Sequence, residues 1–204
     1  MRRIGIVSLS LILAVCCSSA AIAQVVHIDF DTAPGGAPVS NGTVVNTLYA
    51  SYGVTFDAVR CAGCGTDPSV YANSNCLING PISPPNVVTL FGITTCSDIA
   101  ENAQGLVRAT FFSLMDSVCI RVKPVRSTDF AVLHAFNTAD VEIATAYSTA
   151  GTTQDVCITA AGIKKVTFSG SGLNFAWFDD LVFRVESTTP TTRHTWGGIK
   201  TLYR

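Results

Sequence analysis

Short apolar runs, separated by clusters of turn residues, follow one another through most of this 204-residue chain. In the clearest runs, such as SVCIRVK and DVCIT, apolar and polar side chains alternate, which is the pattern of a strand with one buried face. A series of short strands of this kind is typical of an all-β fold with two packed sheets. The pattern predicts about ten strands, at residues 25–30, 53–59, 86–92, 105–112, 117–124, 129–136, 141–147, 155–160, 164–170 and 175–184.

Helical periodicity sustained over three turns is absent from the sequence. One helical turn is predicted at residues 45–53, where Leu48, Tyr49 and Tyr52 would cover one edge of the core. Residues 60–101 depart from the strand pattern, because they carry four cysteines with several prolines, glycines and asparagines. We predict a disulfide-rich loop insert there, inside a sandwich domain that spans residues 24–186.

Both ends of the chain differ from the middle. Arg2 and Arg3, the apolar residues 4–15 and the small residues 21–23 predict a signal peptide that is cleaved after Ala23. Lipid attachment at Cys16 is the alternative, although the bulky Val15 before it disfavours this. The apolar segment is about half as long as a spanning helix, so we expect a secreted or cell-surface protein without a transmembrane anchor.

Residues 187–204 form a threonine- and proline-rich linker followed by TWGGIKTLYR. The linker composition predicts an extended segment. The last ten residues either are a disordered tail or dock a sorting or surface partner. In the second case Trp196, Ile199 and Leu202 or Tyr203 would lie on one side of an induced helix.

The composition excludes one large class of partner. Only 13% of residues are charged, and removal of Arg2 and Arg3 leaves 11 of the 13 basic residues against 14 acidic ones. A mildly acidic chain without interleaved basic and aromatic residues lacks the field that nucleic-acid binding requires.

Six cysteines remain after the signal peptide, and an even number in an exported chain predicts disulfides. Alternation places Cys119 and Cys157 on the outward sides of their strands, so the two would bridge neighbouring strands from outside the core. Zinc binding by CAGC is the alternative for the insert. The expected disulfide cysteines are Cys61 with Cys64, Cys76 with Cys96, and Cys119 with Cys157.

Two acid pairs, in HIDFDT and WFDDLVF, stand inside apolar runs near the two ends of the folded chain. A buried carboxylate is costly unless it is hydrogen-bonded or bound to a cation. We therefore predict that the pairs meet in space and latch the termini together. Alternation puts Asp29 and Asp31 on one side of their strand but separates Asp179 from Asp180, unless a bulge lies between them.

The sequence gives little support to an enzyme. The histidines are His27, His134 and His194, and His134 alternates with apolar residues as a core or half-buried side chain would. There is no Gly-x-Ser-x-Gly elbow and no phosphate-binding loop. We therefore predict a non-catalytic protein.

Five motifs, IDFDT, NTLYASYGVTF, PNVVTLFG, AYSTAGTTQDVCITAAGIKKVTF and FDDLVF, occur in this order. The order resembles secreted bacterial β-sandwich proteins, many of which carry an exosortase sorting tail, and is similar to galactose-binding-like jelly rolls and carbohydrate-binding modules. The likeness covers most of residues 25–184 and implies a two-sheet antiparallel β-sandwich of jelly-roll type. The tail lacks the Pro-Glu-Pro, apolar and basic ending of exosortase substrates.

In many carbohydrate-binding modules of this kind, acidic residues from both ends hold a structural calcium ion. The resemblance thus implies Asp29, Asp31, Asp179 and Asp180 as calcium ligands. Calcium takes six to eight hard oxygen ligands, which two acid pairs and carbonyl groups can provide. Without a metal, the same carboxylates would accept backbone amide hydrogen bonds.

The leading functional hypothesis is a secreted module that binds extracellular glycans. Sugars are recognised by exposed aromatic rings together with amide and carboxylate groups, which points to Tyr71, Asn73, Asn75 and Trp177. Each has an ordinary structural role as an alternative: a core position for Trp177 and turns for the asparagines. The competing hypothesis is a structural or adhesive cell-envelope protein that acts through protein contacts.

Overall fold

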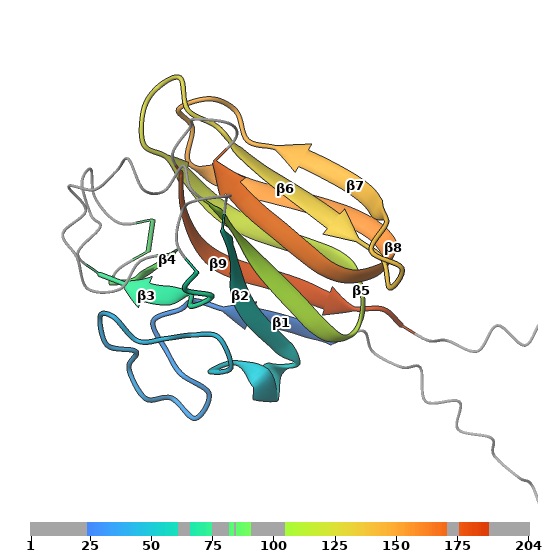
Figure 1. The fold of residues 1–204 in the computed structure, drawn as a ribbon, viewed down its shortest axis with the longest axis horizontal. Coiled ribbons are helices and arrows are strands. Elements are labelled where there is room, and N and C mark those ends of the chain that lie inside the picture. Colours follow the sequence, from blue (N-terminus) through green and yellow to red (C-terminus); the bar gives the residue numbers. More distant parts are fainter. Residues whose placement is uncertain are drawn as a thin grey trace, which may run out of the picture. The chain divides into compact units, whose positions relative to one another are not determined.

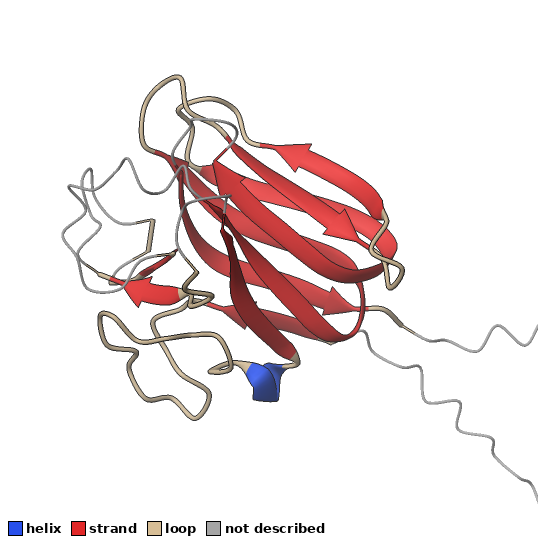
Figure 2. Cartoon of the chain, viewed as in Figure 1, coloured by secondary structure: helices blue, strands red, loops and turns tan. Residues whose placement is uncertain are grey.

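Nine strands and one 3-10 helix form the described part of the chain, which in this computed structural model comprises residues 24–60, 66–74, 82–83, 85–90, 105–170 and 176–187 (Figures 1 and 2). The predicted signal peptide and tail lie outside these residues. The elements are β1 (Val25–Ile28), η1 (Ala50–Tyr52), β2 (Val54–Arg60), β3 (Tyr71–Asn73), β4 (Val87–Thr89), β5 (Gly105–Pro124), β6 (Ala131–Phe136), β7 (Glu142–Tyr147), β8 (Gln154–Gly170) and β9 (Ala176–Val185).

Two long strands, β5 and β8, run through both layers of the fold (Figure 1). The first part of β5 pairs with β2 and with the second part of β8, whereas the second part of β5 pairs with β9 and with the first part of β8. The β5–β8 register shifts between Thr110 and Met115 and again before Ser117. Such irregularities bend and twist a strand pair, so a single hydrogen-bonded sheet folds over itself.

The result is two antiparallel layers. One contains β9, β5 and β8, with β1 and β4 both paired to β9 and with β3 added beside β4. The other has the order β2-β5-β8-β6-β7. The predicted fold class, an all-β, two-sheet antiparallel sandwich of jelly-roll type, is confirmed.

The strand boundaries differ from the prediction in two ways. Residues 105–112 and 117–124, predicted as two strands, form the single strand β5, and residues 155–160 and 164–170 form β8. Bulges carry the hydrogen-bond ladder through these bends, where the sequence shows only a break in alternation. The prediction also missed β3, which shows that the described part of the insert contributes a strand rather than only loop.

Aromatic side chains from the two layers meet in the core. The ring centroids of Phe111 on β5 and Phe183 on β9 are 4.9 Å apart, as are those of Phe168 on β8 and Phe178 on β9. All four residues are 5% exposed or less. These contacts between the inward faces hold the layers together.

A helical turn occurs where it is predicted, as the 3-10 helix η1. Tyr49, just before it, is fully buried, and its ring contacts the rings of Phe30 and Phe56. Leu48 packs against the core, while Tyr52 is 39% exposed and only partly fills the predicted role. Within the described ranges, no helix is long and apolar enough to span a membrane.

Adjacent phenylalanines on β5 allow a matched test of the core. Phe111 is fully buried and Phe112 is 58% exposed. We expect Phe111→Ala to lower the free energy of unfolding by about 3 to 5 kcal/mol, because the loss of the ring leaves a cavity between the layers. Phe112→Ala should change it by less than about 0.5 kcal/mol in the same urea titration. Equal effects would contradict this assignment of faces.

Candidate functional site

The first and last strands lie side by side, as the predicted latch requires. β1 pairs antiparallel with β9, from Val25 opposite Arg184 to Ile28 opposite Leu181. A side-chain contact joins the same strands on the outer face, where Nε2 of His27 lies 2.9 Å from Oδ1 of Asp180. The two ends of the folded chain are therefore held by a backbone ladder and by one side-chain hydrogen bond.

The acids of HIDFDT do not share a strand face, so that prediction is wrong. β1 ends at Ile28, and Phe30 has a positive φ of 54°. Oδ1 of Asp29 accepts hydrogen bonds from the backbone N–H groups of Asp31 (3.1 Å) and Thr32 (2.9 Å). Asp29 thus stabilises a turn in which strand alternation no longer applies.

A bulge separates the two acids of WFDDLVF. On β5, Cys119 pairs with Val182 and Arg121 pairs with Asp179 of β9. One residue lies between the pairs on β5 and two lie between them on β9, so β9 carries an extra residue. That residue, Asp180, has a positive φ of 45°. Asp179 is fully buried, whereas the side chain of Asp180 is 20% exposed and reaches His27. The adjacent acids therefore have different environments.

The buried carboxylate of Asp179 is held by three donors. Its Oδ2 accepts hydrogen bonds from the hydroxyl (2.7 Å) and the backbone N–H (3.2 Å) of Ser83, and its Oδ1 accepts one from the N–H of Asp180 (2.8 Å). Burial raises the pKa of Asp179 to about 7, against the lowering effect of these hydrogen bonds, and the charge of Asp180 adds to the rise.

Asp31 occupies a similar position at this end of the sandwich. Its Oδ1 accepts a 2.7 Å hydrogen bond from the backbone N–H of Asn86. Burial raises the pKa of Asp31, the hydrogen bond from Asn86 lowers it, and the carboxylate of Asp29 raises it further. Burial also raises the pKa of Tyr49, with added contributions from the carboxylates of Asp29 and Asp31. The phenol of Tyr49 thus lies close to the acids.

Two buried oxygen atoms complete this polar end. The hydroxyl of Tyr49 and Oδ1 of Asn86 have no hydrogen-bond partner among the described residues. The amide nitrogen of Asn86 donates to the backbone oxygens of Phe30 and Val39. Leaving a buried oxygen without a hydrogen bond is costly. These two oxygen atoms could therefore each accept a hydrogen bond or bind a cation.

The predicted calcium ligands lie at one end of the fold. In the structure their carboxylates already accept hydrogen bonds from protein groups. Asp29, Asp31 and Asp179 accept backbone N–H bonds, and Asp180 pairs with His27. Across the described ranges, no group of three or more His, Cys, Asp or Glu side chains is placed to hold a metal ion. Calcium binding stays a prediction.

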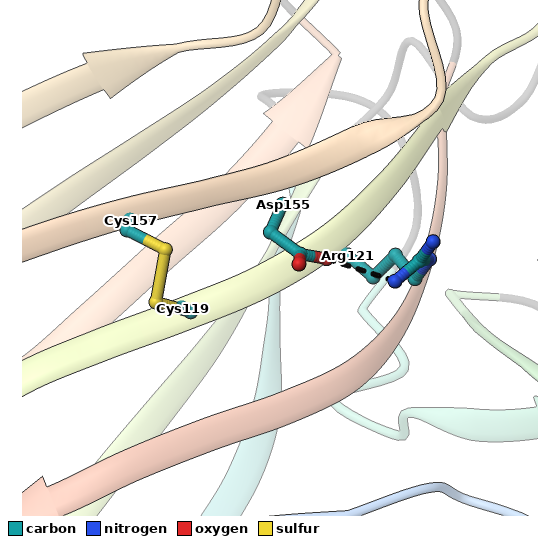
Figure 3. Close-up of a disulfide and its surroundings, with 4 residues drawn as sticks. All are labelled: Cys119, Arg121, Asp155 and Cys157. Carbon is teal, nitrogen blue, oxygen red and sulfur yellow. Dashed lines mark hydrogen bonds and ion pairs between the residues drawn. A yellow bond between two sulfur atoms is a disulfide. The ribbon is translucent and has the colours of Figure 1, made fainter.

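A hollow of about 350 Å³ lies on the outer face of the layer that contains β1, β9, β5 and β8. Its lining residues come from all four strands and are His27, Cys119, Arg121, Asp155, Asp180 and Val182. Arg121 pairs with Asp155 across the β5–β8 ladder, with Nη1 3.3 Å from Oδ1 (Figure 3). We call this the outer hollow.

A disulfide between Cys119 and Cys157 lies beside this ion pair (Figure 3). This is the pairing that alternation predicts. The two residues are directly opposite in the β5–β8 ladder, with their Cα atoms 4.0 Å apart rather than the roughly 5.5 Å expected. The other predicted disulfide cysteines, Cys61, Cys64, Cys76 and Cys96, lie outside the described residues.

The described residues that were predicted to bind sugar, Tyr71, Asn73 and Trp177, do not line the outer hollow. Trp177 is 5% exposed and packs against Val87, so its indole is not available for stacking. Asn73 is also buried, at 1% exposure. Tyr71 is half-buried and its hydroxyl donates to Oδ2 of Asp67 (2.8 Å), while Asn75 lies outside the described residues.

Sequence reasoning therefore missed the outer hollow as a site. One signal was present: Cys119 and Arg121 on one strand, with Asp155 and Cys157 on another, are polar positions with strand spacing. The missing information was which strands are neighbours. His134, by contrast, is half-buried as predicted, and its Nδ1 lies 3.0 Å from the hydroxyl of Thr145, its partner on the neighbouring strand β7.

No protein-family model matches the chain, and no curated protein is significantly similar to it. Among solved structures, it is similar to the CBM22-1–GH10 modules of Clostridium thermocellum xylanase 10B complexed with xylohexaose, with 13% identity and a TM-score of 0.41 over 79% of this chain and 28% of that one. The chain thus spans under a third of the xylanase structure.

Smaller modules show likenesses of the same kind. For CBM29_1 of Piromyces equi the identity is 6% and the TM-score 0.35, over 84% of this chain and 99% of the module. For CsCBM6-3 of Clostridium stercorarium with cellobiose they are 18% and 0.31, over 65% and 95%. TM-scores below 0.5 do not establish a shared fold, and the outer hollow is therefore interpreted from its own residues.

The raised pKa of Asp179 predicts that the stability of the protein depends on pH. This dependence can be measured in buffer that contains a chelator. The pKa of Asp179 is about 7 in the folded protein and 3.8 in the unfolded chain, so between these values only the folded state keeps the proton. Stability is therefore highest below the lower value and falls as pH rises to about 7, by up to about 1.4 kcal/mol per pH unit. Urea titrations between about pH 5 and pH 8 should show this fall.

Asp179→Asn should remove that fall, because an amide does not titrate in this range. The matched control is Asp155→Asn, whose exposed carboxylate should leave the slope unchanged. If Asp179→Asn retained the wild-type slope, another group would be responsible for it.

Proposed function

We propose that this protein is a secreted, non-catalytic module that binds extracellular carbohydrate in the outer hollow. The observation that carries the proposal is the set of two donor–acceptor pairs that line the hollow together with Val182. His27 and Arg121 supply N–H donors, Asp155 and Asp180 supply acceptors, and Val182 lies among them. A sugar ring has the complementary surface, with hydroxyl groups at its rim and C–H groups on its faces.

Charge and size favour a neutral sugar over an ionic ligand. Both donor side chains in the outer hollow already face carboxylates, His27 that of Asp180 and Arg121 that of Asp155. An anion would have to displace these carboxylates, whereas hydroxyl groups can hydrogen-bond to both members of each pair. The volume, about 350 Å³, is at the lower end of the range for small-molecule sites and suits one or two sugar rings.

The same residues support a binding role rather than catalysis. Nucleophilic catalysis by a hydroxyl or a thiol needs that group within reach of a base. The described lining of the outer hollow has no hydroxyl side chain, and its only sulfur, that of Cys119, is in the disulfide. Its two carboxylates, Asp180 and Asp155, are already paired with His27 and Arg121, which suits hydrogen bonding to a sugar.

Arg121→Ala tests the proposal. Loss of a charged donor should weaken glycan binding about tenfold or more, because a hydrogen bond to a charged group contributes roughly 1.5 to 3 kcal/mol. A glycan array would first identify a bound sugar, and calorimetry would then compare the variants. Lys165→Ala is the matched control, since this ion-paired cation belongs to the other layer, and it should bind as the wild type does.

Two results would contradict the proposal. Binding that is lost in Tyr71→Ala but kept in Arg121→Ala would place the site at the insert. An array without reproducible binding, together with attachment to cells that depends on residues 195–204, would favour a structural or adhesive envelope protein.

We also propose a structural calcium ion between Asp29, Asp31, Asp179 and Asp180. Support comes from Oδ1 of Asn86 and the hydroxyl of Tyr49, which are buried oxygens without a hydrogen-bond partner among the described residues. Oxygen donors of this type, with carboxylates, are the chemistry that calcium prefers. The carboxylates would have to exchange some of their present hydrogen bonds for the ion.

Thermal unfolding with calcium and with a chelator tests this second proposal. An ion that binds only the folded state stabilises it, by about 2.7 kcal/mol when its concentration is a hundred times Kd. Asp31→Asn should abolish the difference, and Asp116→Asn, an acid on β5 that pairs with Arg184, should retain it. Identical transitions of the wild type in both buffers would show that the acids act only as hydrogen-bond acceptors.

A further inference from the structure

The disulfide on the outer face has features of an exchangeable bond. Cys157 is exposed and Cys119 is half-buried beside the outer hollow. Exchange requires an external thiolate to reach a sulfur atom, so access largely determines the rate. A disulfide enclosed in the core would not offer that access.

The disulfide lies on the face of the ladder opposite the core. Val118, Ile120, Val156 and Ile158 flank the two cysteines on the same strands, and all four are buried on the opposite face. The ladder from Ser117–Thr159 to Val122–Gln154 continues on both sides of the disulfide. Cleavage would therefore release two thiols to solvent while the inward packing and the backbone pairing remain.

The strand arrangement leaves one sulfur open to attack. The first part of β8 pairs with β5 on one side, and in the described chain no strand pairs with its other side, because β6 joins β8 only from Lys165 onward. A thiolate approaches a disulfide along the S–S axis. From the open edge of β8, that line leads to Sγ of Cys157, with Sγ of Cys119 as the leaving group.

The ladder also holds the two residues close together. Directly opposite residues in an antiparallel pair are roughly 4.5 or 5.5 Å apart, and here the Cα separation is 4.0 Å. Because the backbone pairing continues around the two cysteines, they stay opposite each other when the bond is open.

We propose that Cys119–Cys157 is a thiol–disulfide exchange site that reacts with external thiols in the folded protein. A thiolate forms a bond to Sγ of Cys157, the S–S bond breaks, and Cys119 leaves as a thiolate that takes up a proton from water. A second external thiolate then attacks the sulfur of the bound thiol, which releases an external disulfide and Cys157 as a thiolate. Two electrons pass from the external thiols to the protein.

Glutathione is the probe, and the folded mature chain is the sample. After brief exposure, acid quenching and alkylation, peptide mapping should find glutathione on Cys157 and an alkyl group on Cys119. The rate should rise linearly with thiolate concentration. A rate that reaches a plateau equal to the global unfolding rate would overturn the proposal, because exchange would then require unfolding.

The Phe111→Ala variant distinguishes thiol attack on the folded protein from attack that requires global unfolding. This variant removes a core ring and leaves the outer face unchanged, so its exchange rate should remain within about twofold of the wild-type rate despite faster unfolding. An increase in proportion to the loss of stability would overturn the proposal. Glutathione found first on Cys119 would overturn the assignment of Cys157 as the attacked residue.

Discussion

The antiparallel ladder between β5 and β8 is the constraint on which the rest of the structure depends. It belongs to both layers, so β2, β6 and β7 on one side and β9 on the other are positioned by the same two strands. The bulges between Thr110 and Ser117 change which alternate residues of β5 point into the core. Because of that change, Phe111 can contact Phe183 across the core while Cys119, further along the same strand, faces outward.

Outward-facing residues at one end of this ladder lie next to polar side chains from strands that are distant in sequence. β9 lies beside β5, and β1 lies beside β9, so His27 and Asp180 reach the face that carries Arg121 and Asp155. The ion pairs are exposed and contribute little to stability by themselves. They set the donors His27 and Arg121 next to the acceptors Asp180 and Asp155 on one face.

The proposals of carbohydrate binding and of thiol exchange concern this same face. The disulfide lies beside the Arg121–Asp155 pair, and Cys119 is part of the lining of the outer hollow. Opening the bond would place a new polar group in the outer hollow that a sugar would contact. At the acid-rich end, the carboxylates of Asp179 and Asp31 are wholly or partly buried. Both accept hydrogen bonds, whose energy offsets part of the cost of removing a carboxylate from water.

The sequence by itself determined the all-β class, the inward and outward faces of most strands, the outward position of Cys119 and Cys157, and the meeting of the two acid-bearing ends. Each follows from local alternation or from the cost of burying charge. Only the tertiary structure decided that two predicted strand pairs are continuous, that Asp29 lies in a turn and Asp180 at a bulge, that Trp177 is buried, and that Arg121 meets Asp155. These depend on strand neighbours and on bulges, which arise from packing between distant segments and leave no periodic signal in the chain.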